Sequence, residues 1–386
     1  MNNVSSSNSQ KALVPELRFP EFREEWKKEK LSDFVVRVTR KNKDNQSNLP
    51  LTISSKDGLV DQVTYFNKKV SSKDMSGYYL LKNGEFAYNR SYSVGYDFGS
   101  IKRLDMYDEG ALSTLYICFA LKKHNSDFIK TYFDSLKWYK EIYMIAAEGA
   151  RNHGLLNVPT EDFFDTIHTL PKSIDEQTKI ADFLTLLEQR ILKQEKLVNA
   201  LKLYKRGVEN TLFDEIEAQS CEYIGIDNAV DSIPTSKHQI PSSEYKSDGL
   251  YPVIDQGKRK IVAYSDDSIK LYYDIPAIIY GDHTTNIKYM DTPFILGGDG
   301  TKLLKPRNNA NIKYLYYALA HYNVVQEGYK RHFPILKTKL IPVPNNDTQI
   351  VVSSVLSVID NKIEANESLL DKFSLLKKSF LQKMFI

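Results

Sequence analysis

The stretch DEQTKIADFLTLLEQRI at residues 175–191 recurs as DTQIVVSSVLSVIDNKI at residues 347–363, an offset of 172 (347 minus 175). Both copies have the apolar spacing of an amphipathic helix, and each follows a segment that contains proline. Internal repetition of this kind fixes an architecture before any single motif does. The repeat therefore predicts two long helices, one in the middle of the chain and one at its end, each preceded by a globular domain.

Alternating steps of four and three residues trace an apolar seam along each predicted helix. The first seam visits Ile180, Leu184, Leu187, Ile191, Gln194, Val198, Leu201, Lys205, Val208 and Leu212. The second visits Val352, Leu356, Ile359, Ile363, Asn366, Leu370, Phe373, Lys377, Phe380 and Met384. The polar breaks Gln194 and Lys205 match Asn366 and Lys377 under the same offset.

One amphipathic stripe alone would suit a helix that packs on its own domain. Two seams with polar residues at matched positions favour helices that pair with each other, because a polar seam residue lowers stability while it fixes register and partner. Chain connectivity favours an antiparallel pair. The residues expected to pair the helices are Leu184, Leu187, Ile191, Gln194, Leu201, Leu356, Ile359, Ile363, Asn366 and Phe373.

Composition limits the class of protein without identifying it. The 386 residues are 42% hydrophobic with a formal net charge of +3, which neither requires nor excludes nucleic acid. The two cysteines, Cys118 and Cys221, form no CxxC motif and fit a reducing compartment. The opening MNNVSSSNSQ lacks the apolar segment of a signal peptide, and no apolar run approaches the roughly 18 residues of a membrane span. We expect a cytoplasmic protein without membrane contact.

The pattern along the chain predicts an α+β fold that is duplicated about a pseudo-two-fold axis. Short β-type runs such as LYICFAL (115–121) and AIIYG (277–281) alternate with helix-like stretches at 127–146 and 311–328. The expected parts are a disordered tail (1–14), a first globular domain (15–170), a central helix (171–215), a second globular domain (216–342) and a C-terminal helix (343–386).

This organisation resembles the specificity (S) subunit of type I restriction-modification systems. The resemblance rests on the domain-helix-domain-helix duplication, on LRFPEFREEWKKEKLSDF (17–34), and on LPKSIDEQTKI (170–180) with its looser copy IPVPNNDTQIV (341–351). The second copy departs from the pattern at Thr348, where the first has Glu176, and its prolines lie one residue out of register.

The resemblance implies that each globular domain is a target recognition domain that reads one half of a bipartite double-stranded DNA sequence. The paired helices would set the spacing of the half-sites and dock two methyltransferase (M) subunits, and two restriction/translocase (R) subunits would complete the complex. An S subunit is not an enzyme and binds no cofactor, so S-adenosylmethionine, ATP and Mg would belong to its partners. A helix of about 38 residues is roughly 57 Å long, which matches about 17 base pairs.

The sequence itself offers little chemistry of its own. No two prolines are adjacent, so the Asn/Asp-Pro-Pro-aromatic signature of amino-methyltransferases is absent. GGDGTK (297–302) lacks the spacing of a phosphate-binding P-loop and is expected to be a turn between strands. The seven histidines show no metal-binding spacing. Two alternatives stay open: a coiled-coil scaffold with two protein-binding domains, and an enzyme that acts on nucleic acid through scattered carboxylates.

Five stretches carry the Arg, Asn, His, Thr and Tyr side chains that DNA recognition uses. AYNRSYSVGYDFGSIKR (87–103) supplies Asn89, Arg90, Tyr92, Lys102 and Arg103, and GKRK (257–260) supplies Lys258 and Arg259. YGDHTTNIKY (280–289) supplies His283, Thr284 and Asn286. The matched EGARNH (148–153) and EGYKRH (327–332) supply Arg151, Lys330 and Arg331 as phosphate contacts. Each loop could equally be a solvated loop, and the two histidines of the matched motifs could equally cap structure.

Overall fold

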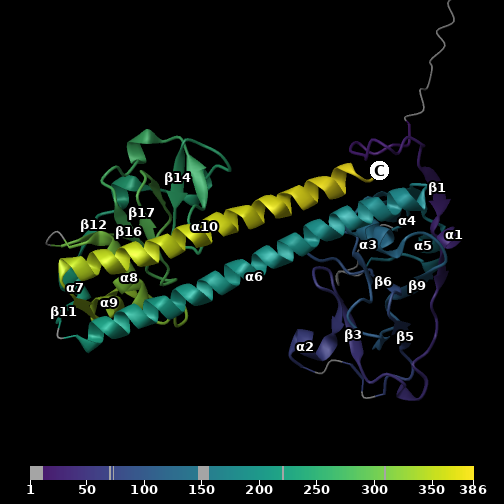
Figure 1. Cartoon of the computed structure of the whole chain (residues 1–386), viewed down its shortest axis with the longest axis horizontal. Helices are drawn as coiled ribbons and strands as arrows, with labels where there is room; N and C mark the ends of the chain where they lie inside the picture. The colour runs from purple at the N-terminus through teal and green to yellow at the C-terminus, as the bar shows by residue number, and fades with distance from the viewer. Residues whose placement is uncertain (1–11, 69–70, 73, 147–155, 220, 308–309) are drawn as a thin grey trace, which may run out of the picture. The chain divides into compact units, whose positions relative to one another are not determined.

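The computed structural model describes residues 12–68, 71–72, 74–146, 156–219, 221–307 and 310–386. Internal contacts divide the chain into unit 1, residues Met1–Gln194 with Leu369–Ile386, and unit 2, residues Glu195–Ser368. The long helices α6 (Ile174–Ala218) and α10 (Asn346–Lys383) each contribute one part to each unit (Figure 1). Each unit joins a mixed α/β domain to a helix pair, which confirms the predicted α+β fold.

Unit 1 contains two four-stranded sheets, ordered β2-β9-β6-β7 and β4-β3-β8-β5, and a short sheet in which β1 pairs antiparallel with β10. The strands are β1 (Lys27–Lys30), β2 (Val35–Arg37), β3 (Pro50–Ser54), β4 (Gly58–Asp61), β5 (Tyr79–Lys82), β6 (Phe86–Asn89), β7 (Ser100–Arg103), β8 (Glu109–Leu112), β9 (Ile117–Leu121) and β10 (Ile167–Leu170). The short helices are α1 (Leu31–Phe34), α2 (Gln62–Phe66), α3 (Ser126–Asp134), α4 (Tyr139–Ile145) and α5 (Thr160–Asp165), with a 3-10 turn η1 (Lys43–Asn45).

Unit 2 repeats this plan, with sheets ordered β12-β19-β16-β17 and β13-β18-β14-β15 and a short antiparallel β11-β20 pair. The strands are β11 (Glu222–Gly225), β12 (Val230–Ile233), β13 (Gln239–Ile240), β14 (Tyr251–Ile254), β15 (Ala263–Ser265), β16 (Ala277–Gly281), β17 (Ile287–Met290), β18 (Ile295–Gly297), β19 (Thr301–Pro306) and β20 (Leu340–Val343). The helices are α7 (Ile226–Ala229), α8 (Ile312–His321) and α9 (Phe333–Lys337), with 3-10 turns η2 (Ser236–His238), η3 (Ser242–Glu244) and η4 (Ser268–Lys270).

The two domains differ at one edge of the second sheet. In unit 1 the edge strand β5 follows the β3-β4 hairpin and runs antiparallel to β8. In unit 2 the edge strand β13 precedes the β14-β15 hairpin and runs parallel to β18. The duplicated domains therefore share their strand order in the first sheet and have diverged at this edge of the second.

The long helices begin with the same device in both units. The Ser173 hydroxyl and the Asn345 amide oxygen, which are equivalent under the offset of the repeat, accept hydrogen bonds from backbone N–H groups of the first turn. Such side chains satisfy N–H groups that have no partner within the helix. Gln177 and Gln349 turn back and donate to the carbonyls of Pro171 and Pro344, each at 2.9 Å.

Helices α6 and α10 pair antiparallel in both units. In unit 1 the Phe183 and Phe380 rings lie 5.0 Å apart, and Lys377 pairs with Glu188 at 2.8 Å. In unit 2 Lys202 pairs with Glu367 and Lys205 with Asp360, both at 2.6 Å. Residue numbers rise along α6 while those of the partners fall along α10, so the antiparallel prediction is confirmed. Every position of both seams is buried or half-buried.

Two predicted helices are shorter than the pattern suggested. The stretch 127–146 is broken into α3 and α4 by Leu136, whose φ is +62°. The break places the Trp138 ring in the core, where its indole N–H donates to the Phe133 carbonyl at 2.8 Å. The stretch 311–328 is helical only as far as His321. Within the described ranges, no helix combines the length and the apolar character needed to cross a membrane.

Candidate nucleic-acid interface

Three loops of unit 2 converge on one another and contain most of the residues predicted to contact DNA there. We call residues 255–260, 282–286 and 323–332 the three-loop cluster. They include Lys258, Arg259, His283, Thr284, Asn286, Lys330 and Arg331. The first loop follows β14, the second connects β16 to β17, and the third lies between α8 and α9.

Gln256, which the sequence did not single out, joins the first two loops. Its backbone carbonyl accepts from the Thr284 hydroxyl and, at 3.0 Å, from the Asn286 amide. Its side-chain oxygen accepts from the His283 N–H at 3.2 Å, and its amide donates to the Asp299 carbonyl at 3.0 Å. The two loops are therefore held as one body, with the Gly298–Gly300 turn, expected from GGDGTK, between β18 and β19 beneath them.

Asp282 joins the second loop to the third. This aspartate is 2% exposed, and its carboxylate accepts from the backbone N–H of Phe333 at 2.9 Å. Its carbonyl accepts from the backbone N–H of His332 at 2.7 Å. The buried His332 ring in turn accepts at Nε2 from the Glu327 N–H at 3.1 Å. Of the two roles left open for this histidine, the structure places it in a capping position.

The surface of the three-loop cluster carries unpaired positive charge. Lys258, Arg259 and Arg331 are exposed, and none of them forms an ion pair with any residue that the structure describes. Lys330 pairs with Glu327 at 2.6 Å, where both side chains are exposed. The buried carboxylate of Asp282 lies 3.8 Å from the Lys302 ammonium, which offsets its negative charge.

The corresponding loop of unit 1, residues 90–99 between β6 and β7, is anchored by Arg90. Its guanidinium donates to the carbonyls of Val158 at 3.1 Å and Leu115 at 3.0 Å, and its own carbonyl accepts from the Leu156 N–H. Asn89 accepts from the Ser91 N–H at 3.0 Å. Arg90 and Asn89 thus shape this loop, while Tyr92 projects from it with 57% exposure.

Gly99 closes the same loop at a position where only glycine fits. Its φ is +77°, and a Cβ atom there would collide with the carbonyl oxygen of Asn89. The Tyr139 hydroxyl donates to the Gly99 carbonyl at 2.5 Å. The end of the loop is therefore pressed against β6 and α4.

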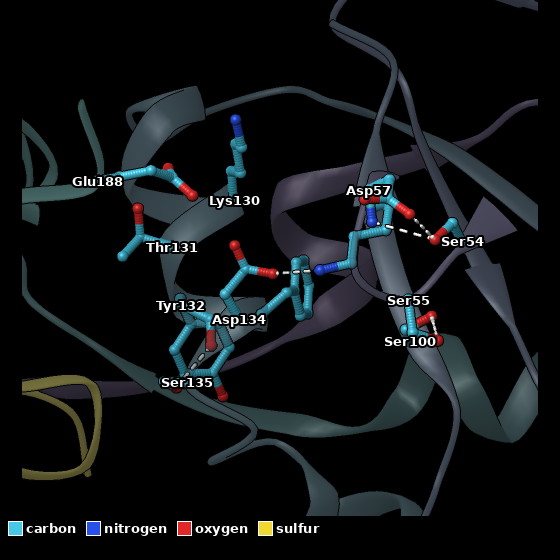
Figure 2. Close-up of polar contacts among 12 residues, drawn as sticks. Ser54, Ser55, Asp57, Ser100, Lys130, Thr131, Tyr132, Asp134, Ser135 and Glu188 are labelled. Carbon is cyan, nitrogen blue, oxygen red and sulfur yellow. Dashed lines mark hydrogen bonds and ion pairs between the residues drawn. The ribbon is translucent and has the colours of Figure 1, made fainter. Parts of the chain in front are cut away.

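The positive charges of Lys102 and Arg103 are matched inside unit 1. Lys102 pairs with Asp134 at 2.7 Å, and Figure 2 shows the Asp134 carboxylate among neighbouring polar contacts of unit 1. Burial opposes the charged form of Lys102, but the Asp134 carboxylate outweighs it and raises the pKa of the ammonium. Arg103 pairs with Asp105 at 2.5 Å and Asp127 at 2.7 Å. Neither side chain offers free charge comparable to that of the three-loop cluster.

Arg151 and the rest of EGARNH lie outside the described residues, so its predicted phosphate contact has no structural counterpart here. Its matched motif, EGYKRH, forms residues 327–332 of the third loop of the three-loop cluster. No group of three or more His, Cys, Asp or Glu side chains suited to a metal ion occurs in the described part of the chain.

The polar seam positions have partners that the repeat relates to one another. Lys377 pairs with Glu188 in unit 1, and Lys205 pairs with Asp360 in unit 2. The lysines differ by 172 (377 minus 205), and so do the carboxylates (360 minus 188). Burial opposes ionisation of Glu188, but the Lys377 ammonium outweighs it and lowers the pKa of that carboxyl. The offset of the repeat could have revealed this pairing from the sequence.

The outer faces of the helices also repeat. Exposed apolar residues occur at Leu186, Leu197, Leu203 and Tyr204 of α6, and at their equivalents Val358, Leu369, Leu375 and Leu376 of α10. Unit 1 holds Leu186 with the last three of the α10 set, and unit 2 holds Val358 with the last three of the α6 set. Each unit therefore exposes the same apolar pattern.

Comparison with known proteins gives likeness in structure but not in sequence. No protein-family model matches the chain, and no curated protein matches it. The crystal structure of a type I restriction-modification system S subunit from M. genitalium is 16% identical, with a TM-score of 0.62, over 97% of this chain and 99% of that one. An HsdS subunit from Thermoanaerobacter tengcongensis is 16% identical, with a TM-score of 0.46, over 93% of this chain and 96% of that one. At this identity the first likeness establishes a shared fold.

Proposed function

We propose that this chain, which has the fold of a type I restriction-modification S subunit, is the DNA-specificity subunit of such a complex. The observation that carries the proposal is the contact among three loops of unit 2, which expose the cations Lys258, Arg259 and Arg331. Cations supply most of the sequence-independent affinity for DNA, and polar side chains at base edges supply specificity. His283, Thr284 and Asn286 on the same loops are suited to the second task.

In unit 1 the proposed recognition loop is residues 90–99 with its anchor Arg90. Arg90 acts by holding the loop against the carbonyls of Val158 and Leu115, so it positions the exposed Tyr92. Lys102 and Arg103 are left out of the proposed contacts because carboxylates of the same unit neutralise them. Each domain would read one half of a bipartite target, and the two helices would fix the gap between the halves.

The repeated apolar positions are the proposed docking sites for two methyltransferase subunits. Two equivalent surfaces suit two copies of one partner, because each copy meets the same side chains. The chain would contribute recognition without catalysis, and S-adenosylmethionine, ATP and magnesium would be bound by the methyltransferase and restriction/translocase subunits.

The docking proposal is tested by the stoichiometry of the complex. The full chain is purified with the methyltransferase subunit encoded in the same genome, and the mass is measured by light scattering. For the unaltered chain we expect a complex of one chain with two methyltransferase subunits. The double variant Leu197→Ser with Tyr204→Ser should bind only one methyltransferase subunit. Leu369→Ser with Leu376→Ser should remove the other copy.

The matched control is Leu192→Ser, because Leu192 is exposed on α6 while the equivalent position on α10 is Glu364. This variant should keep both methyltransferase subunits. If the two double variants bind as many copies as the unaltered chain, the repeated apolar positions are not the docking sites.

A further inference from the structure

Tyr329 is a large aromatic side chain that the structure leaves almost entirely in solvent. It is 88% exposed, and it lies in the third loop of the three-loop cluster. One face of its ring stacks on the His283 imidazole, with centroids 4.6 Å apart and planes 7° from parallel. The ring therefore has one covered face and one free face.

The backbone turn before Tyr329 and the hydrogen bonds of His283 support the stack. Gly328, whose φ is +57°, provides the left-handed turn directly before Tyr329. His283 Nδ1 lies 3.2 Å from the Lys330 carbonyl, and because a carbonyl only accepts, this nitrogen carries the hydrogen and donates. The His283 N–H is held by Gln256, and its carbonyl accepts from the Gln326 amide at 3.2 Å. The hydrogen bonds thus fix the His283 imidazole on which the Tyr329 ring stacks.

Cations flank this ring along the same loop. Arg331 lies two residues after Tyr329, beyond Lys330, which is paired with Glu327. Lys258 and Arg259 belong to the adjoining first loop. A flat aromatic face together with cations is the combination by which proteins stack the bases of single strands while they hold the backbone. A protein partner would instead favour a broad apolar patch with few charges at its centre.

We propose that the Tyr329–His283 stack is a base-stacking platform, which takes the free face of a nucleobase at an unstacked step of the bound DNA duplex. The inference rests on the proposed DNA-recognition function and adds a specific role to the three-loop cluster. Unstacking a base step has a cost, and aromatic or apolar side chains that fill the opened step offset it. His283 supports the Tyr329 ring from behind, so it is a positioning residue.

The test uses the full chain in complex with its methyltransferase subunit and a duplex that carries the methylated sequence. 2-Aminopurine is placed in turn at each adenine position of the half-sites, since its fluorescence reports unstacking. Tyr329→Ala should weaken binding by roughly 5- to 150-fold and abolish the fluorescence change at one position. The dependence of affinity on salt should stay unchanged, because a neutral ring releases no counterions.

Two matched variants separate stacking from other roles. Tyr329→Phe keeps the ring and should bind within about threefold of the unaltered chain. Val325→Ser removes a second exposed apolar side chain, 81% exposed, from the same loop without touching the stack, and it should bind DNA normally. All variants should keep the methyltransferase subunit.

Three results would overturn the proposal. If Tyr329→Ala binds the duplex as tightly as the unaltered chain and gives the same fluorescence change, the platform alone is refuted. Loss of the methyltransferase subunit from both Tyr329→Ala and Val325→Ser would make the loop a protein-docking surface. If the unaltered complex prefers no duplex sequence, the DNA-recognition proposal itself fails and the platform fails with it.

Discussion

The two domains hold the equivalent loops that follow β6 and β16 by opposite chemistry at the same point of the scaffold. In unit 1 the buried Tyr88 of β6 is followed two residues later by Arg90, which donates to loop carbonyls. In unit 2 the buried Tyr280 of β16 is followed two residues later by Asp282, whose carboxylate accepts from the Phe333 N–H at the start of α9. The strand is present in both units, while the side chain that anchors the following loop is positively charged in unit 1 and negatively charged in unit 2. The loop chemistry has therefore diverged on a scaffold that the duplication preserved.

The anchor of unit 2 is expected to have the largest effect when it is removed. Asp282→Ala leaves the Phe333 N–H without its buried acceptor and should lower the free energy of unfolding of unit 2 by about 2–3 kcal/mol. Hydrogen exchange of the segment 323–337 should accelerate, while that of unit 1 stays unchanged. Asp282→Asn retains an acceptor oxygen and should lose less. Equal protection in all three proteins would contradict the anchoring role.

The anchor of unit 1 should matter somewhat less, because Arg90 is half-buried. Arg90→Ala removes two hydrogen bonds from a charged donor. It should weaken binding to the half-site read by the first domain by about tenfold or more. Methylation assays on DNA altered in one half-site at a time would detect the change. Arg90→Lys should restore part of the effect, since one ammonium can reach only one of the carbonyls. An assembled Arg90→Ala complex that methylates the same sites at the same rate would show that this loop does not read DNA.

The helix pair, in contrast to the loops, has kept its chemistry in both units, and this similarity can be tested by pH. Lys377→Met should reduce stability at neutral pH by about 1 kcal/mol, because the pair with Glu188 is half-exposed. The folded-state pKa of Glu188 lies below its usual 4.5, so the pair stabilises above that pH and its contribution is lost as the pH falls through the folded pKa.

Denaturant titrations of both proteins across this range would measure the difference. The unaltered chain and Lys377→Met should converge in strongly acidic solution, where Glu188 is protonated. A difference that persists at the lowest accessible pH would assign the effect to packing of the lysine stem.

The smallest expected effect is a change in the salt dependence of DNA affinity, which should differ between an unpaired cation and a paired one. Arg331→Ala should weaken binding to all duplexes alike and reduce the salt slope of the affinity by about one. Lys102→Met removes a cation that Asp134 already neutralises, so its salt slope should equal that of the unaltered chain. Fluorescence anisotropy at several salt concentrations gives both slopes. If the two variants reduce the slope equally, the paired cation contacts phosphate as well.

The sequence predicted the helices well because their period is local. The heptad spacing of residues such as Ile180, Leu184 and Lys205 identifies the buried seam of one helix. The repeat then identifies the second helix that pairs with it. The same offset relates Glu188, the partner of Lys377, to Asp360, the partner of Lys205. The sequence therefore contained enough information to predict both ion pairs. Their pairing was missed because carboxylates on an amphipathic helix normally face solvent.

The loops could not be derived in the same way. Gln256 meets Asn286, and Arg90 meets Val158, through backbone atoms far apart in the chain. No periodicity encodes such contacts. Composition identified the loops that carry Arg90 and His283, but Lys102 shows its limit: a lysine near a recognition loop is neutralised by Asp134, on a helix that the sequence does not place beside it.

Methylome mapping after co-expression with the cognate methyltransferase subunit tests the central claim most directly. The account predicts one asymmetric motif made of two half-sites with a fixed gap, in which Asp282→Ala and Arg90→Ala degrade different halves. A stable complex that leaves the genome unmethylated, or that methylates one uninterrupted motif, would contradict it.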